Sequence, residues 1–230
     1  MRHVLLDNPP PMLRFQNLCK RYDDHLIFKG IGYAASAGCF AVTDESGSGK
    51  STLLSILAGA IAPDEGDVWI GGHSLLTAPL KAKGLLSYIP EDCMPDPMMT
   101  GLDYLQRIAS DRQTTIDART MDLADRFDLT PHKEKRFEQM SFGTRKKFFL
   151  TATTIGESAV VIADEPAAGL DAPARAVLSE LFKTLSQDRA VFFSSYDVSL
   201  TNACNAVLVS FRDMTSSTPR HQELDPERDK

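Results

Sequence analysis

Residues 39–57 read CFAVTDESGSGKSTLLSIL, in which a short apolar run is followed by a loop of small residues and then by a helical pattern. The apolar run predicts a buried strand over 39–43, and the spacing of leucine and isoleucine predicts a helix over 51–61. Glycines before a helix let backbone N–H groups converge on an anion, while a lysine adds charge and a serine hydroxyl can ligate Mg²⁺. The loop therefore predicts a nucleotide phosphate site, with a glycine-rich helix cap as the alternative. The residues expected to hold the phosphates are Ser46, Gly47, Ser48, Gly49, Lys50, Ser51 and Thr52.

Outward from this loop, strand-like and helix-like segments alternate along the chain. Further strands are expected at 68–70, 85–89, 159–163, 191–193 and 206–209, and helices near 102–109, 116–127, from Ser141 onward and 177–185. This alternation favours an α/β protein with a mainly parallel sheet. Only helical patterns occur between Pro90 and Gly156, so a helical subdomain at about 91–156 is expected within one domain spanning 1–214. The polar segment 215–230 is expected to be a disordered tail.

Composition narrows the class of protein. The chain has 230 residues, with 25 basic against 31 acidic side chains and a net charge of −6. This balance opposes nucleic-acid binding, which depends on many contacts from lysine and arginine to phosphate. No apolar run approaches the 20 or so residues that a membrane span needs, and the N-terminus lacks the apolar core of a secretory leader. The four cysteines are dispersed along the chain, which indicates buried free thiols in a reducing cytosol. They are Cys19, Cys39, Cys93 and Cys204.

A second motif carries paired carboxylates. Residues 160–166 read VVIADEP, so a buried strand is expected to deliver Asp164 and Glu165 to its carboxyl end, where ligands of open α/β sheets bind. Asp164 is suited to hold Mg²⁺ through water, and Glu165 to polarise an attacking water as a general base. The alternative is an acidic surface turn after a core strand.

With both motifs in place, residues 13–211 resemble the nucleotide-binding subunit of an ATP-binding cassette (ABC) transporter. The run Met140-Ser141-Phe142-Gly143-Thr144 stands where that family has its Leu-Ser-Gly-Gly-Gln signature. Ala168-Gly169-Leu170-Asp171 matches the family's D-loop, and Tyr22 stands where the family stacks an aromatic ring on adenine. The resemblance implies a P-loop NTPase fold of ABC type, with a parallel sheet core, an N-terminal antiparallel β part and an inserted helical subdomain.

The resemblance also implies a division of labour. Lys50 and the loop backbone would hold the phosphates of ATP, Ser51 and Asp164 would serve Mg²⁺ with help from Glu91, and Glu165 would be the base. Two chains, identical or different, would pair head to tail around two ATP molecules. The residues expected to act across that interface are Ser141 and Gly143, and Asp171 of the D-loop is expected at the nucleotide. Ser141 is a good N-cap, so the helix expected over 142–155 would direct its positive end at a γ-phosphate.

Several positions depart from the family pattern. Asp44 replaces the first glycine of the phosphate loop, where it adds negative charge and could pair with Lys50. Glu91 replaces the Q-loop glutamine, Phe142 and Thr144 alter the signature, and Tyr196 replaces the switch histidine that touches the γ-phosphate. Loss of one transition-state donor typically costs 10²–10³ in rate, so slow hydrolysis is expected. Attenuated hydrolysis is favoured over none because the other motif residues are all present, namely Lys50, Ser51, Asp164, Glu165 and Asp171.

Two functions remain open. The first is an ATPase subunit at the cytoplasmic face of a membrane that powers a separate membrane-spanning subunit, docked on Met98, Met99, Leu102 and Leu105. The second is a catalytically impaired module in which ATP-dependent dimerisation switches a partner complex. The Ser141 and Asp171 motifs oppose a third reading, an unrelated P-loop kinase or GTPase.

Overall fold

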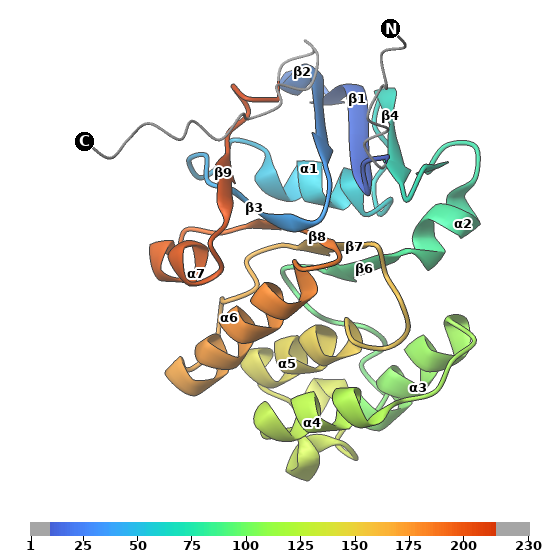
Figure 1. The fold of residues 1–230 in the computed structure, drawn as a ribbon, viewed down its shortest axis with the longest axis vertical. Helices are drawn as coiled ribbons and strands as arrows, with labels where there is room; N and C mark the ends of the chain where they lie inside the picture. The colour runs from blue at the N-terminus through green and yellow to red at the C-terminus, as the bar shows by residue number, and fades with distance from the viewer. Residues whose placement is uncertain (1–9, 215–230) are drawn as a thin grey trace, which may run out of the picture.

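The computed structural model describes residues 10–214, so the expected tail at 215–230 lies outside the described residues. The fold is built on two sheets, an antiparallel one at one end of the molecule and a parallel one across its middle (Figure 1). The smaller, antiparallel one has the strand order β2-β1-β4-β5. Its strands are β1 (Leu13–Tyr22), β2 (His25–Ala35), β4 (Glu65–Ile70) and β5 (His73–Ser74). It is the antiparallel part that the resemblance implies.

The larger sheet is parallel and five-stranded, in the order β6-β7-β8-β3-β9. Its strands are β3 (Gly38–Val42), β6 (Leu86–Ile89), β7 (Val160–Ala163), β8 (Ala190–Ser194) and β9 (Val207–Val209). All five coincide within a few residues with strands predicted from apolar runs. Because the strands are parallel, the loops that follow β3, β6, β7 and β8 all leave from the same edge.

The helices of the described residues surround this sheet. They are α1 (Lys50–Leu57), α2 (Pro79–Gly84), α3 (Gly101–Asp111), α4 (Ala118–Arg126), α5 (Phe142–Ala152), α6 (Ala172–Leu185) and α7 (Val198–Ala203), with 3-10 turns at Thr130–His132 and Phe137–Gln139. Figure 1 shows α1 on the side of the antiparallel sheet, and α3, α4 and α5 on the opposite side of the parallel sheet.

Strand β7 separates two apolar cores. Side chains alternate between the faces of a strand, so Val160 and Ile162 pack with α1 and the antiparallel sheet, whereas Val161 and Ala163 pack with the helical region. All four residues are fully buried. An unbroken apolar run is what a strand covered on both faces requires.

The helical region between β6 and β7 is held by helix caps and aromatic packing. Apart from one isolated bridge, between Thr100 and Arg136, its secondary structure is helical, as expected. Thr100 and Asp103 form a capping box at α3, and Asp117 caps α4. Its centre is a cluster of aromatic rings from Tyr104, Phe137, Phe148 and Phe149.

The structure corrects three details of the sequence analysis. The helix expected over 51–61 ends at Leu57, because Gly59 adopts a left-handed conformation with a φ of 64°. The helix expected over 142–155 ends at Ala152. Cys19 is half-buried rather than buried, and all four cysteines are free. In the described part of the chain, no helix has the length and apolar character needed to cross a membrane.

Gly101, at the start of α3, is predicted to tolerate no side chain. A Cβ atom there would overlap the Phe148 ring, whose Cε2 atom would lie 2.8 Å away, and Phe148 is buried in the aromatic cluster. Gly101→Ala should therefore lower the free energy of unfolding by about 1–3 kcal/mol.

Gly84 provides the control, because a Cβ atom at that helical position meets nothing within 4 Å. Gly84→Ala should leave stability unchanged or raise it by about 0.4–1 kcal/mol. Urea unfolding of both variants measures the difference, and equal stabilities would contradict the prediction.

Candidate functional site

The loop between β3 and α1 has the backbone that the sequence predicts for anion binding. Gly47 and Gly49 have φ values of 77° and 99°, in the left-handed region that favours glycine. A Cβ atom on Gly49 would also overlap the side chain of Ile27 on β2. Helix α1 begins at Lys50 and has no acidic residue in its first turn, so its positive end faces the loop without internal compensation.

Lys50 is buried, and its ammonium already has a full set of partners. Its Nζ atom donates to the backbone carbonyl oxygens of Asp44 and Glu45, the latter at 2.8 Å, and to the phenol oxygen of Tyr196 at 2.8 Å. Nζ also lies 4.3 Å from the centroid of the Tyr196 ring. A phosphate that binds Lys50 must therefore replace acceptors that the chain itself supplies.

The carboxylate of Asp44 does not pair with Lys50, so that expectation is wrong. Only the Asp44 carbonyl faces Lys50, whereas the Oδ2 atom accepts a hydrogen bond from the Phe211 backbone N–H at 3.0 Å. Asp44 therefore ties the phosphate loop to the segment after β9. Its negative charge stays near the loop without being neutralised by the lysine.

At the carboxyl end of β7, Asp164 is held by a residue that the sequence analysis missed. Asp164 is only 2% exposed, and its Oδ1 atom accepts the Ser194 hydroxyl at 2.6 Å. The same Ser194 oxygen accepts the Glu165 backbone N–H at 2.9 Å. Ser194 is the last residue of β8, which runs parallel to β7. Strand adjacency could have revealed Ser194, but that adjacency cannot be read from apolar runs alone.

Glu165 combines backbone strain with an unpartnered carboxyl oxygen. Its φ is 43°, which is unusual for a residue with a side chain. Among the described residues, its buried Oε1 atom has no hydrogen-bond partner. Burial, followed by the charge of Asp164, raises the pKa of Glu165 above the ordinary glutamate value. A raised pKa in a buried carboxyl is typical of a general base.

Glu91 and Tyr22 are the two remaining residues that the sequence predicts to contact the nucleotide, and both are exposed. Glu91 follows β6 at the same edge of the parallel sheet, is exposed, and contributes to the raised pKa of Glu165. Tyr22 ends β1 and is 44% exposed, so it is not a core aromatic residue. It pairs with His25, two residues before the Ile27 that contacts the phosphate loop.

The side chains at this edge of the sheet can supply only part of the ligand shell of Mg²⁺, and a bound nucleotide and water would supply the rest. No group of three or more His, Cys, Asp or Glu side chains suited to a metal occurs in the described range. Ser51 follows Lys50 in the first turn of α1, and Asp164 is a buried carboxylate at the end of β7, at the same edge of the parallel sheet. Mg²⁺ in proteins usually takes one or two carboxylates and completes its shell with water and substrate phosphates. Ser51, Asp164 and Glu91 match that partial donor set.

Ser141, Gly143 and Asp171 form a second group around the start of α5. The Ser141 hydroxyl caps α5 by accepting the Thr144 backbone N–H at 3.2 Å, as predicted. Gly143 lies against the Gly169 carbonyl so closely that a Cβ atom would overlap it. Asp171 caps α6, and its Oδ2 atom lies 3.7 Å from the Lys147 ammonium. Within residues 10–214, no hydrogen bond or ion pair joins these three residues directly to the phosphate loop.

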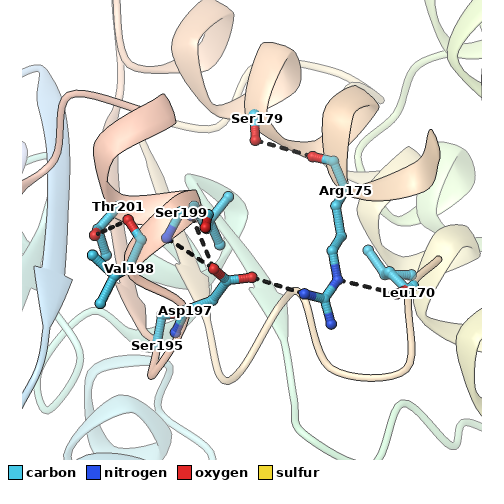
Figure 2. Close-up of polar contacts among 9 residues, drawn as sticks. Leu170, Arg175, Ser179, Ser195, Asp197, Val198, Ser199 and Thr201 are labelled. Atoms are coloured by element: carbon cyan, nitrogen blue, oxygen red, sulfur yellow. Dashed lines mark hydrogen bonds and ion pairs between the residues drawn. The ribbon is translucent and has the colours of Figure 1, made fainter. Parts of the chain in front are cut away.

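Figure 2 shows how the segment after β8 is anchored. The Asp197 carboxylate accepts the backbone N–H groups of Ser199 and Leu200 at the start of α7, at 2.9 and 3.2 Å. Its other oxygen accepts the Arg175 guanidinium at 3.0 Å, and Arg175 Nε donates to the Leu170 carbonyl at 3.1 Å. Tyr196, the neighbour of Asp197, is thereby tied to the loop at 168–171.

Only part of the surface expected to dock on a membrane-spanning subunit is exposed to solvent. Met98 is exposed, but Met99 packs against the core. Leu105 is buried within the core, so its assignment to a docking face is wrong. The residue lies on the inward face of α3, which the helical spacing alone did not distinguish from the outward one.

Comparisons with known proteins identify relatives of this chain. The family model described as ABC transporter matches residues 35–168. The linearmycin resistance ATP-binding protein of Bacillus subtilis is 24% identical over 85% of this chain and 65% of its own length. An ABC transporter ATP-binding/permease protein of Mycobacterium tuberculosis is 28% identical over 81% of this chain and 22% of its own length. The chain thus spans less than two thirds of either relative.

The solved structures show the fold. An ATP-binding cassette in a dimeric post-hydrolysis state, bound to ADP and Pi, superposes with a TM-score of 0.76. It covers 90% of this chain and 97% of that one, at 17% sequence identity. The expected fold class, a P-loop NTPase of ABC type, is confirmed.

The contact between Lys50 and Tyr196 predicts an unusual phenol titration. The Lys50 ammonium, followed by the Ser46 hydroxyl, stabilises the phenolate and so lowers the pKa of Tyr196 below the usual 10 or so. Lys50→Met removes the positive charge and should raise the pKa of Tyr196 towards that ordinary value.

Phenolate absorbance measures this titration, taken as the difference between each protein and its Tyr196→Phe counterpart. The subtraction removes the other tyrosines. A Tyr196 midpoint that is the same with and without Lys50 would show that the contact does not exist in solution.

Proposed function

The chain belongs to the ABC transporter family, and from that premise we propose that it binds Mg-ATP, hydrolyses it slowly and powers a separate membrane-spanning subunit from the cytoplasmic face. One observation carries the proposal. The phosphate loop, the Asp164–Glu165 pair and Tyr196 follow β3, β7 and β8 at one edge of the parallel sheet, and Lys50 contacts Tyr196 directly. Ligands of open α/β sheets bind at this edge.

Binding of ATP would use the phosphate loop and Lys50. The β- and γ-phosphate oxygens would replace the carbonyl and phenol oxygens that now accept from Lys50. Ser51 and Asp164, with Glu91, would hold Mg²⁺, which supplies charge neutralisation at the phosphates. The exposed ring of Tyr22 would stack on adenine, which is worth about 1–3 kcal/mol.

Hydrolysis would depend on Glu165 as the general base for water. Its raised pKa means that the carboxylate form is reached only at a pH above the ordinary glutamate range, and the acidic limb of the rate profile should lie there. Tyr196 would turn from Lys50 to the γ-phosphate and donate its single O–H. It is neutral as a donor, unlike a protonated histidine, so turnover is expected to be slow.

The second group of residues would act across a dimer. Ser141 and Gly143 lie at the capped start of α5, where the helix dipole favours an anion. They would face the γ-phosphate of an ATP held by another cassette, identical or different, with Asp171 beside them. The dimeric cassette structure of the same fold supports this arrangement by analogy.

The competing proposal is an ATP-gated module without turnover. It is favoured by the saturated hydrogen bonding of Lys50 and by the substitutions at Asp44, Glu91 and Tyr196. In that case ATP would close a dimer and switch a partner complex, and Glu165 would have no kinetic role.

Steady-state hydrolysis of Mg-ATP separates the two proposals. If Glu165 is the base, Glu165→Gln should lower kcat by about 10²–10⁴-fold while ATP binding is retained. Glu134→Gln, at an exposed position in the helical region, is the matched control and should leave kcat unchanged. If the wild-type chain and both variants bind ATP and none of the three hydrolyses it, the ATPase proposal is overturned and the module is favoured.

Removal of the Asp44 charge should tighten ATP binding. A charge pair about 6 Å apart is worth roughly 3 kcal/mol at an effective dielectric of 20 and below about 1 kcal/mol in water. Asp44→Asn keeps an oxygen that can accept from the Phe211 N–H, so its ATP Kd should fall by about threefold to a hundredfold.

Asp44→Gly removes the same charge but also the bond to Phe211, so it should melt at a lower temperature than Asp44→Asn. Isothermal titration and thermal melting measure the two effects. An unchanged Kd in Asp44→Asn would refute the electrostatic explanation.

A further inference from the structure

Helix α5 carries a fully buried lysine that the reaction described above does not use. Lys146 is 0% exposed, and its Nζ atom donates to the Glu165 backbone carbonyl oxygen at 2.9 Å. Nζ also lies 4.8 Å from the centroid of the Phe142 ring. Among the described residues, the Glu165 carbonyl is the one hydrogen-bond acceptor of this ammonium.

A buried ammonium with a single acceptor is costly, because burial removes its hydration. Accordingly, burial lowers the pKa of Lys146 below the ordinary lysine value. The groups that oppose this shift and favour the charged form are Cys93, Glu91, Asp164 and Glu165. An apolar residue of similar length would fill the same space without this penalty. The buried ammonium therefore indicates a specific role for its hydrogen bond to the Glu165 carbonyl.

That acceptor belongs to a strained residue. Glu165 has a φ of 43°, and a non-glycine residue in the left-handed region costs about 1 kcal/mol or more unless its surroundings hold it. Its N–H donates to the Ser194 hydroxyl at 2.9 Å. Its carbonyl accepts from Lys146 and, at 3.1 Å, from the Ala168 N–H. Ser194 and Lys146 therefore hold the two sides of the Glu165 main chain.

We propose that Lys146 is a positioning residue for Glu165: its buried ammonium fixes the Glu165 main chain and so aims the carboxylate. This inference rests on the proposed ATPase function. Phe142 supports the arrangement, because its ring lies over the Lys146 ammonium and against Gly169. A movement of α5 relative to β7 would consequently be transmitted to Glu165 through this one side chain.

The first test needs no nucleotide. Lys146→Met keeps the length of the side chain and removes the ammonium. In the nucleotide-free chain, amide hydrogen exchange at Ala168 and Leu170 should become about tenfold faster or more, because local opening of the loop is no longer restrained. Lys183→Met, an exposed lysine of α6, is the matched control and should leave these amides unchanged.

The second test measures catalysis. If Glu165 is misplaced, kcat of Lys146→Met should fall by about tenfold to a hundredfold, whereas the ATP Kd stays within about twofold. Lys146→Arg retains a charged donor and should restore part of kcat. If Lys146→Met does not fold, Lys146→Gln is measured in both tests, with the same expected directions.

The outcomes are distinct. Unchanged loop exchange, unchanged kcat, or parallel losses of kcat and ATP affinity would each overturn the positioning role. A wild-type chain that binds ATP without turnover overturns the proposed ATPase function instead. In that case the exchange experiment still decides whether Lys146 holds the Glu165 loop.

Discussion

Burial of β7 on both faces is the constraint on which the site depends. Its four residues are excluded from water between two cores, so the chain can place charge only where the strand ends. Asp164 and Glu165 occupy that point, and Ser194 at the end of β8 bonds to both. The hydroxyl is decisive because a carboxylate that is 2% exposed requires a donor. The parallel pairing of β7 with β8 thus supplies both the location of the carboxylates and the group that stabilises them.

Oxygen atoms of the chain itself occupy the positions around Lys50 where phosphate oxygens would bind. Lys50 bonds to two carbonyls and the Tyr196 phenol, so each of its N–H groups already has an oxygen acceptor. Affinity for ATP would then be the difference between two sets of charge-assisted hydrogen bonds rather than the gain from one. The charge of Asp44 acts in the same direction, since its carboxylate bonds to the Phe211 N–H and not to Lys50, and so keeps a negative charge near the site of the phosphates. Slow or conditional turnover would follow from this starting state as much as from the chemistry of the phenol.

The features predicted from the sequence are those set by local pattern. Apolar runs predicted β3 and β7, and the identity of Ser141 predicted its cap on α5, because a strand core and a helix cap each depend on a few adjacent residues. Ser194 and Lys146 were missed because their importance arises only when β8 and α5 lie beside the end of β7. The same limit explains Leu105, whose burial is decided by the direction in which α3 faces the core. The end of α1 was missed because Gly59 interrupts a pattern that is still apolar at Ile61.

The predicted site residues of this chain form two separate groups, and polar contacts connect the two groups. Lys50, Asp164 and Glu165 lie at the sheet edge, while Ser141, Gly143 and Asp171 surround the start of α5. Polar contacts join the regions: Lys146 reaches from α5 to the Glu165 carbonyl, and Arg175 reaches from α6 to Asp197, beside Tyr196. Gly143 of α5 also packs directly against the Gly169 carbonyl, so α5 and the loop at 168–171 are in close contact. If a second cassette places its ATP against Ser141, displacement of α5 has a direct mechanical route to Glu165. The two groups of residues are therefore mechanically coupled within one chain, although each group would bind a different ATP molecule.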